Sequence, residues 1–490
     1  MHMRRFLISV AYSVPLFLVF SSIVGESIPF SFDAARDFVT AHAGKISLIG
    51  PPTGIPGIFY GPYWIWLIQS AFFISRNPAI VACIILTLPY FVLLPLILRK
   101  FSNLWGVKIS VIIWLLFTLR YMSYFTSLWN PNLAPLLFWI VAYSAMRLGV
   151  VAPSKDQLFY SVLMGIMVGL ILNIHLSFGI GVFLGSFLYI ILRKKIRSVI
   201  TFLLGTGLVY VPFIIFELRH GFRQLQAIAE TLRVALWYQQ SMVGHTGLHP
   251  IHIIDKFFRV IPADILYVSR SFATFLLLSI GGWFIVQLVV GKIRLKQTEK
   301  YLGLFLFLCS AAILGVFLAS PNPVWEYHFI GVETIILLFF AIIMRHMRVV
   351  AYSAFIWVVV LVVLNVIAWS KSLDIDPKTL GGLATKRYII DSIYQDIGQN
   401  SSFALTSYSP SLYTYDYDYL VQWYARRFRK LMPVAIENAQ TVYLIIPPTS
   451  APIFEDFVHY RTPDDQFETA NSWLAQDNTT ILKRIRKKYE

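Results

Sequence analysis

Long runs of apolar residues, separated by short polar connectors, fill the first 369 positions of the chain. A helix needs about 20 apolar residues to cross a bilayer. Six uncharged runs meet this length, and five more are shorter or carry one charge. The pattern predicts an all-α membrane domain, a polytopic bundle of about 11–13 transmembrane helices. The eleven runs cover residues 6–24, 79–98, 109–125, 129–146, 158–174, 176–192, 198–216, 271–290, 301–319, 329–344 and 349–369.

The tail, residues 370–490, has the composition of a soluble domain and predicts a small α/β unit. Its basic run, residues 483–488, is interpreted as a solvated face, and no residue of the tail is predicted to be catalytic. The expected elements are helices at 385–399 and 419–431 and strands at 403–408 and 441–446.

The charged residues are distributed unevenly along the chain, and this distribution bears on partners and orientation. Of the 490 residues, 13% are charged, compared with about 25% in a soluble chain. The net charge of +16 belongs to the membrane part, because the tail has as many acidic as basic side chains. This distribution excludes nucleic acid as a partner and follows the positive-inside rule. The basic clusters are residues 4–5, 99–100, 193–197, 292–300 and 345–348.

Placing these clusters in the cytoplasm puts two long connectors, residues 25–57 and 217–264, outside the cell membrane together with the tail. The scheme predicts a multi-pass plasma membrane protein with an extracytoplasmic C-terminal domain. It holds if a twelfth apolar stretch, residues 58–75, is re-entrant or interfacial. The alternative is a true crossing, which would leave residues 99–100 outside.

The first outside connector holds the densest set of polar residues. Asp33 and Asp37 are four residues apart and share one helical face, with Arg36 beside them. Gly50-Pro51 follows, and then Tyr60-Gly61-Pro62. The spacing by itself favours a structural interpretation, a capped interfacial helix with an internal Asp–Arg pair.

An acidic motif in this position, followed by a Gly-Pro-aromatic segment that opens the next apolar stretch, resembles the GT-C fold membrane glycosyltransferases. The pattern is similar to the protein O-mannosyltransferase and lipid A aminoarabinose transferase types. Trp129-Asn130-Pro131 and the terminal soluble domain fit the same family. The chain departs from the mannosyltransferases, which have Asp-Glu where this sequence has Asp33-Ala34.

The resemblance implies a polyprenyl-phosphate-linked sugar as donor and a glycan, lipid or protein hydroxyl as acceptor, and it leaves a divalent metal open. Asp33 would be the base, with Asp37 as the second candidate. One carboxylate suffices because a phosphate leaving group needs little protonation, unlike the alcohol that leaves in glycoside hydrolysis. Arg36 is a candidate for binding the leaving phosphate.

Two further residues could line the same cavity. Arg120 lies near the outer end of its span, where it either holds the lipid phosphate or extends its charged end to the interface. His175 lies in a tight outside turn between two spans, where a lone histidine is more often structural.

A third outside connector contributes Glu326-Tyr327-His328 at the entry to a span, which we predict to contact the donor. Glu333 lies seven residues later on the same helical face, and a carboxylate at that depth needs a partner or a polar cavity. Tyr60, Glu333 and His175 are the predicted cavity-lining residues.

Two other function classes compete with an enzyme. A transporter or flippase of lipid-linked sugars predicts ionisable residues near the middle of several helices, whereas most acids here lie in outside connectors. A non-catalytic scaffold gives no reason for a polar first connector rich in Gly and Pro. No Asp-x-Asp motif occurs in the outside connectors, so a sugar-nucleotide site is not expected.

Overall fold

The structure is a computed structural model of the chain. It describes residues 2–150, 155–193, 195–238, 250–266, 268–320, 324–372, 374–379, 381–397, 402–408 and 415–487. Residues 239–249 of the predicted outside connector therefore lie outside the described part.

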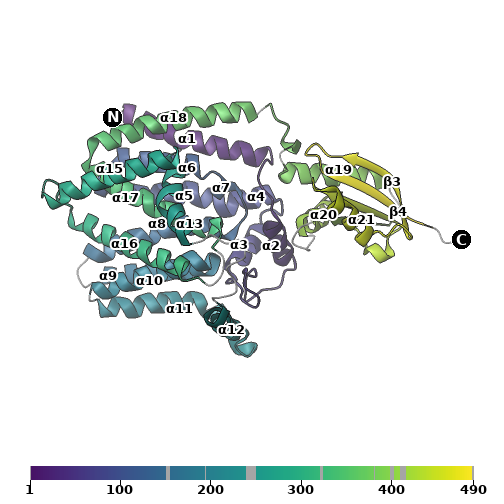
Figure 1. Cartoon of the computed structure of the whole chain (residues 1–490), viewed down its shortest axis with the longest axis horizontal. Helices are drawn as coiled ribbons and strands as arrows, with labels where there is room; N and C mark the ends of the chain where they lie inside the picture. Colours follow the sequence, from purple (N-terminus) through teal and green to yellow (C-terminus); the bar gives the residue numbers. More distant parts are fainter. Residues whose placement is uncertain are drawn as a thin grey trace.

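Parallel and antiparallel helices form one elongated bundle, with a smaller domain attached to one end (Figure 1). Within the described residues, eight helices are long and apolar enough to span a membrane. They are α4–α5 (Pro78–Trp105), η2–α8 (Asn130–Val150), α9 (Lys155–Ile174), α11 (Ile196–Arg219), α15 (Arg270–Val289), α16 (Gln297–Leu318), η4–α17 (Glu326–His346) and α18 (Arg348–Ser372).

Three further apolar helices complete the match to the eleven predicted runs. They are α1 (His2–Val24), α6 (Val107–Arg120) and α10 (Leu176–Leu192). The predicted fold class, a helical membrane bundle with a small α/β domain, is confirmed. Length keeps α6 and α10 out of the eight, because they have 14 and 17 residues and the 14 residues of α6 rise only about 21 Å.

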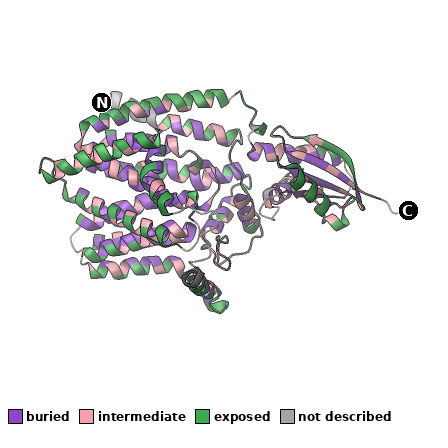
Figure 2. Cartoon of the chain, in the orientation of Figure 1, coloured by how far each residue is buried: buried purple, intermediate pink, exposed green. Residues whose placement is uncertain are grey.

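The outer surface of the bundle is apolar, as lipid contact requires. Exposed residues follow the outer helices along their whole length (Figure 2), and Leu278 on α15 is 72% exposed. Inside, α9 and α11 approach closely through glycine. A Cβ atom on Gly165 would lie 2.1 Å from the carbonyl oxygen of Phe202, so only glycine permits this contact.

The uncertain stretch at residues 58–75 contains one short helix, α3 (Tyr63–Phe72). Ten residues rise about 15 Å, half of the hydrocarbon thickness. The next helix, α4 (Pro78–Ala82), continues through the π-helical turn η1 (Cys83–Thr87) into α5 (Leu88–Trp105) and makes the crossing. The structure therefore favours the re-entrant or interfacial alternative.

The smaller domain is a four-stranded sheet in the order β1-β2-β4-β3, packed with helices. β1 and β2 are parallel, and β4 is antiparallel to both β2 and β3. The two predicted strands are present, whereas α21, β3 and β4 were not predicted. The elements are α19 (Leu383–Ile397), β1 (Phe403–Ser407), α20 (Tyr415–Phe428), β2 (Thr441–Ile446), α21 (Ala451–Arg461), β3 (Phe467–Leu474) and β4 (Thr480–Arg486).

The interpretation of the basic run as a solvated face is wrong for two of its members. Arg484 is buried on β4, pairs with Asp464 and donates to the carbonyl of Thr462 at 2.9 Å. Lys483 pairs with Asp396 at 2.7 Å. The tertiary fold of the domain places these charges against Asp464, between α21 and β3, and Asp396, on α19, which the linear sequence keeps apart.

The polar elements gather at one end of the bundle. The first connector helix α2 (Phe32–His42), α3, α12 (Arg223–Tyr238) and the sheet domain all lie there (Figure 1). The connector between α15 and α16, which carries basic residues 292–300, lies at the opposite end. The domain and the first connector therefore share one side of the membrane.

We predict that this shared side faces outward. Protease added to intact spheroplasts should remove residues 370–490 and spare the basic connector at 292–300, because only the former would be accessible. Immunoblotting with antibodies against the two segments would measure this, with lysed spheroplasts as the positive control. Cleavage of the tail only after lysis would contradict the orientation.

Candidate functional site

The helix α2 carries the predicted carboxylates. It begins where the Ser31 side chain accepts the backbone N–H of Ala34 at 3.3 Å, and Asp33 lies in its first turn, where the helix dipole favours negative charge. One face of α2 is apolar and buried, including Phe38 and Ala41. The other face presents Asp33 toward the interior of the polar end.

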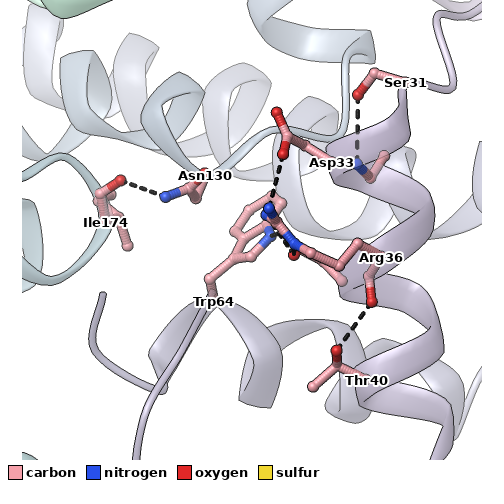
Figure 3. Close-up of polar contacts among 9 residues, drawn as sticks. Ser31, Asp33, Arg36, Thr40, Trp64, Asn130 and Ile174 are labelled. Carbon is pink, nitrogen blue, oxygen red and sulfur yellow. Dashed lines mark hydrogen bonds and ion pairs between the residues drawn. The ribbon is translucent and has the colours of Figure 1, made fainter. Parts of the chain in front are cut away.

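Arg36 joins the two carboxylates (Figure 3). Its Nη1 lies 2.8 Å from Asp33 Oδ1, and its Nη2 and Nε both lie 2.9 Å from Asp37 Oδ1. The side chain of Asp33 is 40% exposed, whereas that of Asp37 is 1% exposed. The capped helix with an internal ion pair is therefore present, and it leaves Asp33 accessible to a substrate while Asp37 is enclosed.

The buried Asp37 has a second partner that the sequence did not suggest. Trp64, on α3, donates its Nε1–H to Asp37 Oδ2 at 2.9 Å. Burial raises the pKa of the Asp37 carboxyl to about 7, although Arg36 and the Trp64 hydrogen bond act in the opposite direction. A signal was available in the aromatic segment after Gly61-Pro62, but its pairing with α2 was not predictable.

The Gly-Pro segment is folded back on itself and placed beside α2. Gly50 N–H donates to the Tyr60 carbonyl at 2.7 Å, and Gly61 N–H donates to the Asn173 carbonyl at 3.1 Å. A Cβ on Gly61 would lie 1.3 Å from Asn173 Oδ1, so the approach requires glycine. Burial raises the pKa of Tyr60, and the nearby Tyr327 and Asp33 add to this effect, so its hydroxyl stays a hydrogen-bond donor.

The short helix η4 (Glu326–Phe329) carries three of the predicted site residues, Glu326, Tyr327 and His328. Tyr327 lies within electrostatic range of Asp33 and packs against Trp129 with ring centroids 5.3 Å apart. His328 stacks close to Tyr327, with a centroid distance of 4.1 Å, and its Nδ1 accepts the Trp325 N–H at 2.8 Å.

His175 lies behind η4. Its ring is fully buried, packs on Phe178 at 5.7 Å and is close to His328 and to the backbone of residues 327–330. Asn130 Nδ2 donates to the Ile174 carbonyl at 2.6 Å (Figure 3), which fixes the turn that carries the histidine. His175 thus supports η4 from inside the protein.

Glu326, the first residue of η4, pairs with Lys256 at 3.0 Å. The Lys256 side chain is only 16% exposed, whereas that of Glu326 is 79% exposed. Lys256 comes from η3 (Lys256–Val260), which lies between α13 (Pro250–Asp255) and α14 (Ile261–Leu266). Sequence analysis missed this cation because it belongs to the weakly patterned end of the long connector.

Arg120 and Glu333, which both lie within electrostatic range of Tyr121, form a neighbouring group. Arg120 Nε donates to the Asp264 carbonyl of α14 at 2.5 Å. Glu333 is buried in the first turn of α17 (Val332–His346), where both carboxylate oxygens accept the Gly331 N–H at 3.0 and 2.9 Å. The hydroxyls of Tyr90, Tyr121 and Tyr124 lie within its electrostatic range.

An apolar cavity of about 710 Å³ lies beside this group. Its lining comes from α15, α16 and α17 and, at one end, from η3, which begins with Lys256, and α14, which Arg120 contacts. Neither cation lines the cavity itself. Residues that line it at this end include Phe257, Pro262 and Leu266.

The structure thus brings Asp33, Arg36, Asp37, Tyr60 and Tyr327 together, with His175 and His328 beside them. Arg120 and Glu333 form the neighbouring group, and Glu326 pairs with Lys256 of η3, which leads into α14. Arg36 contacts two carboxylates, so phosphate binding by Arg36 stays a prediction. Within the described residues, no three His, Cys, Asp or Glu side chains are grouped to hold a metal ion.

Comparison with known proteins gives a match in fold but not in sequence. No protein-family model and no curated protein match the chain. A crystal structure of ArnT from Cupriavidus metallidurans bound to undecaprenyl phosphate aligns with a TM-score of 0.57 and 11% sequence identity, over 97% of each chain. The apo form of the same protein gives 0.53 and 11% over 98% of each chain.

ArnT is a lipid A aminoarabinose transferase, a GT-C glycosyltransferase. The alignment covers almost the whole chain, with the sheet domain included. The chain therefore has the ArnT-type GT-C fold, which confirms the fold implied by the sequence resemblance.

The raised pKa of Asp37 predicts a pH-dependent stability. The unfolded chain releases this proton near pH 4 and the folded protein near pH 7, so the wild type loses stability as pH rises through this window. Asp37→Asn cannot titrate, so its free energy of unfolding should not fall in this way. The free energy of unfolding of the variant minus that of the wild type should therefore increase by about 2 kcal/mol from pH 5 to pH 8. Unfolding midpoints of the detergent-solubilised proteins would measure the difference, and a difference independent of pH would contradict the assignment.

Proposed function

We propose that the protein is a membrane glycosyltransferase that moves a sugar from a polyprenyl-phosphate donor to an acceptor hydroxyl at the outer face of the membrane. The observation that carries the proposal is the accessible carboxylate of Asp33, held by Arg36 at the polar end of a GT-C fold. The aligned ArnT structure contains undecaprenyl phosphate, which supports the same class of donor lipid here.

The chemistry follows from the position of Asp33. Its carboxylate takes the proton from the acceptor hydroxyl as that oxygen forms a bond with the anomeric carbon of the sugar. The bond between the anomeric carbon and the phosphate oxygen breaks, and the electron pair leaves with the lipid phosphate. Arg36 holds the base in one rotamer, and Tyr60 and Tyr327 offer hydroxyl groups beside it.

The donor fits the neighbouring group and its cavity. An apolar cavity of about 710 Å³ would take part of the isoprenoid chain, and its volume is within the usual range of ligand sites. Arg120, which contacts α14, and Lys256, at the start of η3, would bind the phosphate beside this cavity. Guanidinium and ammonium groups stabilise charge that develops on a leaving oxygen.

The distribution of acids favours an enzyme over a transporter. In the described spanning helices the carboxylates lie in end turns. Asp156, Glu299 and Glu333 lie in the first turns of α9, α16 and α17, and Glu217 lies in the last turn of α11. A transporter would need ionisable side chains at mid-helix. We therefore do not propose the flippase alternative.

Asp33→Asn tests the base directly. The substitution preserves size but cannot accept a proton, so turnover should fall by about 10²–10⁴-fold. Transfer of labelled sugar from polyprenyl phosphate in detergent would be measured per monodisperse protein. The matched control is Glu230→Gln, an exposed carboxylate that pairs with Arg233 on α12, and it should be neutral. Near-normal turnover in Asp33→Asn would move the assignment to Asp37.

Arg120→Ala tests the donor site. Loss of a charge-assisted contact to phosphate costs about 1.5–3 kcal/mol, so the KM for the polyprenyl-phosphate sugar should rise roughly 10- to 150-fold. Arg219→Ala, an exposed arginine at the end of α11, is the matched control. An unchanged donor KM would mean that Arg120 only anchors α14 through the Asp264 carbonyl.

A further inference from the structure

The helix that carries Asp33 is not part of any spanning helix. Among the described elements, α2 packs chiefly on α20 of the C-terminal domain and on the short helix α3. Its Asp37 face meets α3 through Trp64. Its opposite, apolar face meets the domain. The position of α2 therefore depends on a contact outside the membrane bundle.

Backbone and charged contacts fasten the segment just before α2 to the start of α19. The N–H groups of Leu383 and Ala384 donate to the carbonyls of Ile28 and Glu26, both at 3.0 Å. Lys386 Nζ donates to the carbonyl of Phe30 at 2.8 Å. Arg387 pairs with the Glu26 carboxylate, so these contacts from the first turn of α19 fix where α2 begins.

Tyr419 on α20 is the centre of the contact with α2 itself. It is fully buried, with ring centroids 4.8 Å from Phe38 on α2 and 6.0 Å from Phe72 on α3. Its hydroxyl donates to the Arg76 carbonyl at 2.6 Å. One side chain therefore joins α2, α3 and the connector that leads into α4.

The far end of α2 is held as well. His42, the last residue of α2, contacts the Arg426 guanidinium of α20 through its Nε2. Phe32 at the first turn packs against Tyr415, with centroids 5.5 Å apart. The domain thus contacts α2 along its full length, on the side away from Asp33 and Arg36.

We propose that the C-terminal domain positions α2 for catalysis and that Tyr419 is the central positioning residue. The proposal rests on the proposed function. Tyr419 touches no reacting atom and acts through Phe38, which lies one residue after Asp37 on the same helix. A displacement of about 1 Å in a catalytic group can cost about 10²-fold in rate, so small changes in this contact should reach Asp33.

The test compares Tyr419→Ala with Tyr419→Phe in the full-length protein. The alanine variant removes the ring between α2 and α3, so hydrogen exchange of the α2 amides should rise about tenfold or more while that of α8 is unchanged. Its kcat should fall about 10- to 100-fold with the donor KM unchanged within about threefold. The phenylalanine variant retains the ring and should restore most of the kcat and of the α2 protection.

Two further variants keep the result interpretable. Tyr460→Ala, on the exposed face of α21, is the matched control and should change neither measurement. Lys386→Met removes the hydrogen bond to the Phe30 carbonyl and should produce smaller increases in α2 exchange and smaller losses of kcat. It replaces Tyr419→Ala in the test if that variant does not fold.

Three outcomes would overturn the proposal: unchanged α2 exchange in Tyr419→Ala, loosened α2 with normal kcat, or lost kcat without loosening of α2. Failure of the proposed function looks different, because the wild-type protein would then transfer no sugar. In that case the exchange of α2 alone decides whether the domain positions this helix.

Discussion

The bridge that Arg36 makes between Asp33 and Asp37 is the interaction on which the polar end of the molecule depends. A buried carboxylate is costly unless charge and hydrogen bonds compensate it, and Asp37 is almost fully enclosed. Arg36 and Trp64 together direct three N–H groups at its two oxygens. This requirement fixes the side-chain rotamer of Arg36, the orientation of α2 and the distance between α2 and α3.

The same bridge separates the roles of two chemically identical groups. Asp33 and Asp37 differ in burial because one lies in the first turn of α2 and the other faces α3. Environment alone therefore makes one carboxylate accessible and shifts the pKa of the other toward neutrality. Arg36 couples them, since any movement of the buried group is transmitted to the accessible one through a single guanidinium.

Around this centre, the fold collects short elements from distant parts of the chain. The spans supply a rigid apolar frame, whereas α2, α3, η4 and η3 are short and could not be stable alone. Each is held by specific contacts: Gly61 on Asn173, Tyr327 on Trp129 and Lys256 on Glu326. The C-terminal domain belongs to the same arrangement, because it covers the apolar face of α2 that lipid or water would otherwise contact.

The sequence by itself determined the apolar frame, the grouping of the first connector and the tail at one end of it, and the helix that carries Asp33, Arg36 and Asp37. These features depend on local quantities, namely run length, charge placement and i, i+4 spacing. Only the tertiary structure decided that Trp64 buries Asp37, that Lys256 meets Glu326 and that Tyr419 supports α2. Such pairs join residues tens to hundreds of positions apart, and no local pattern encodes which side chain will be opposite another once the helices pack.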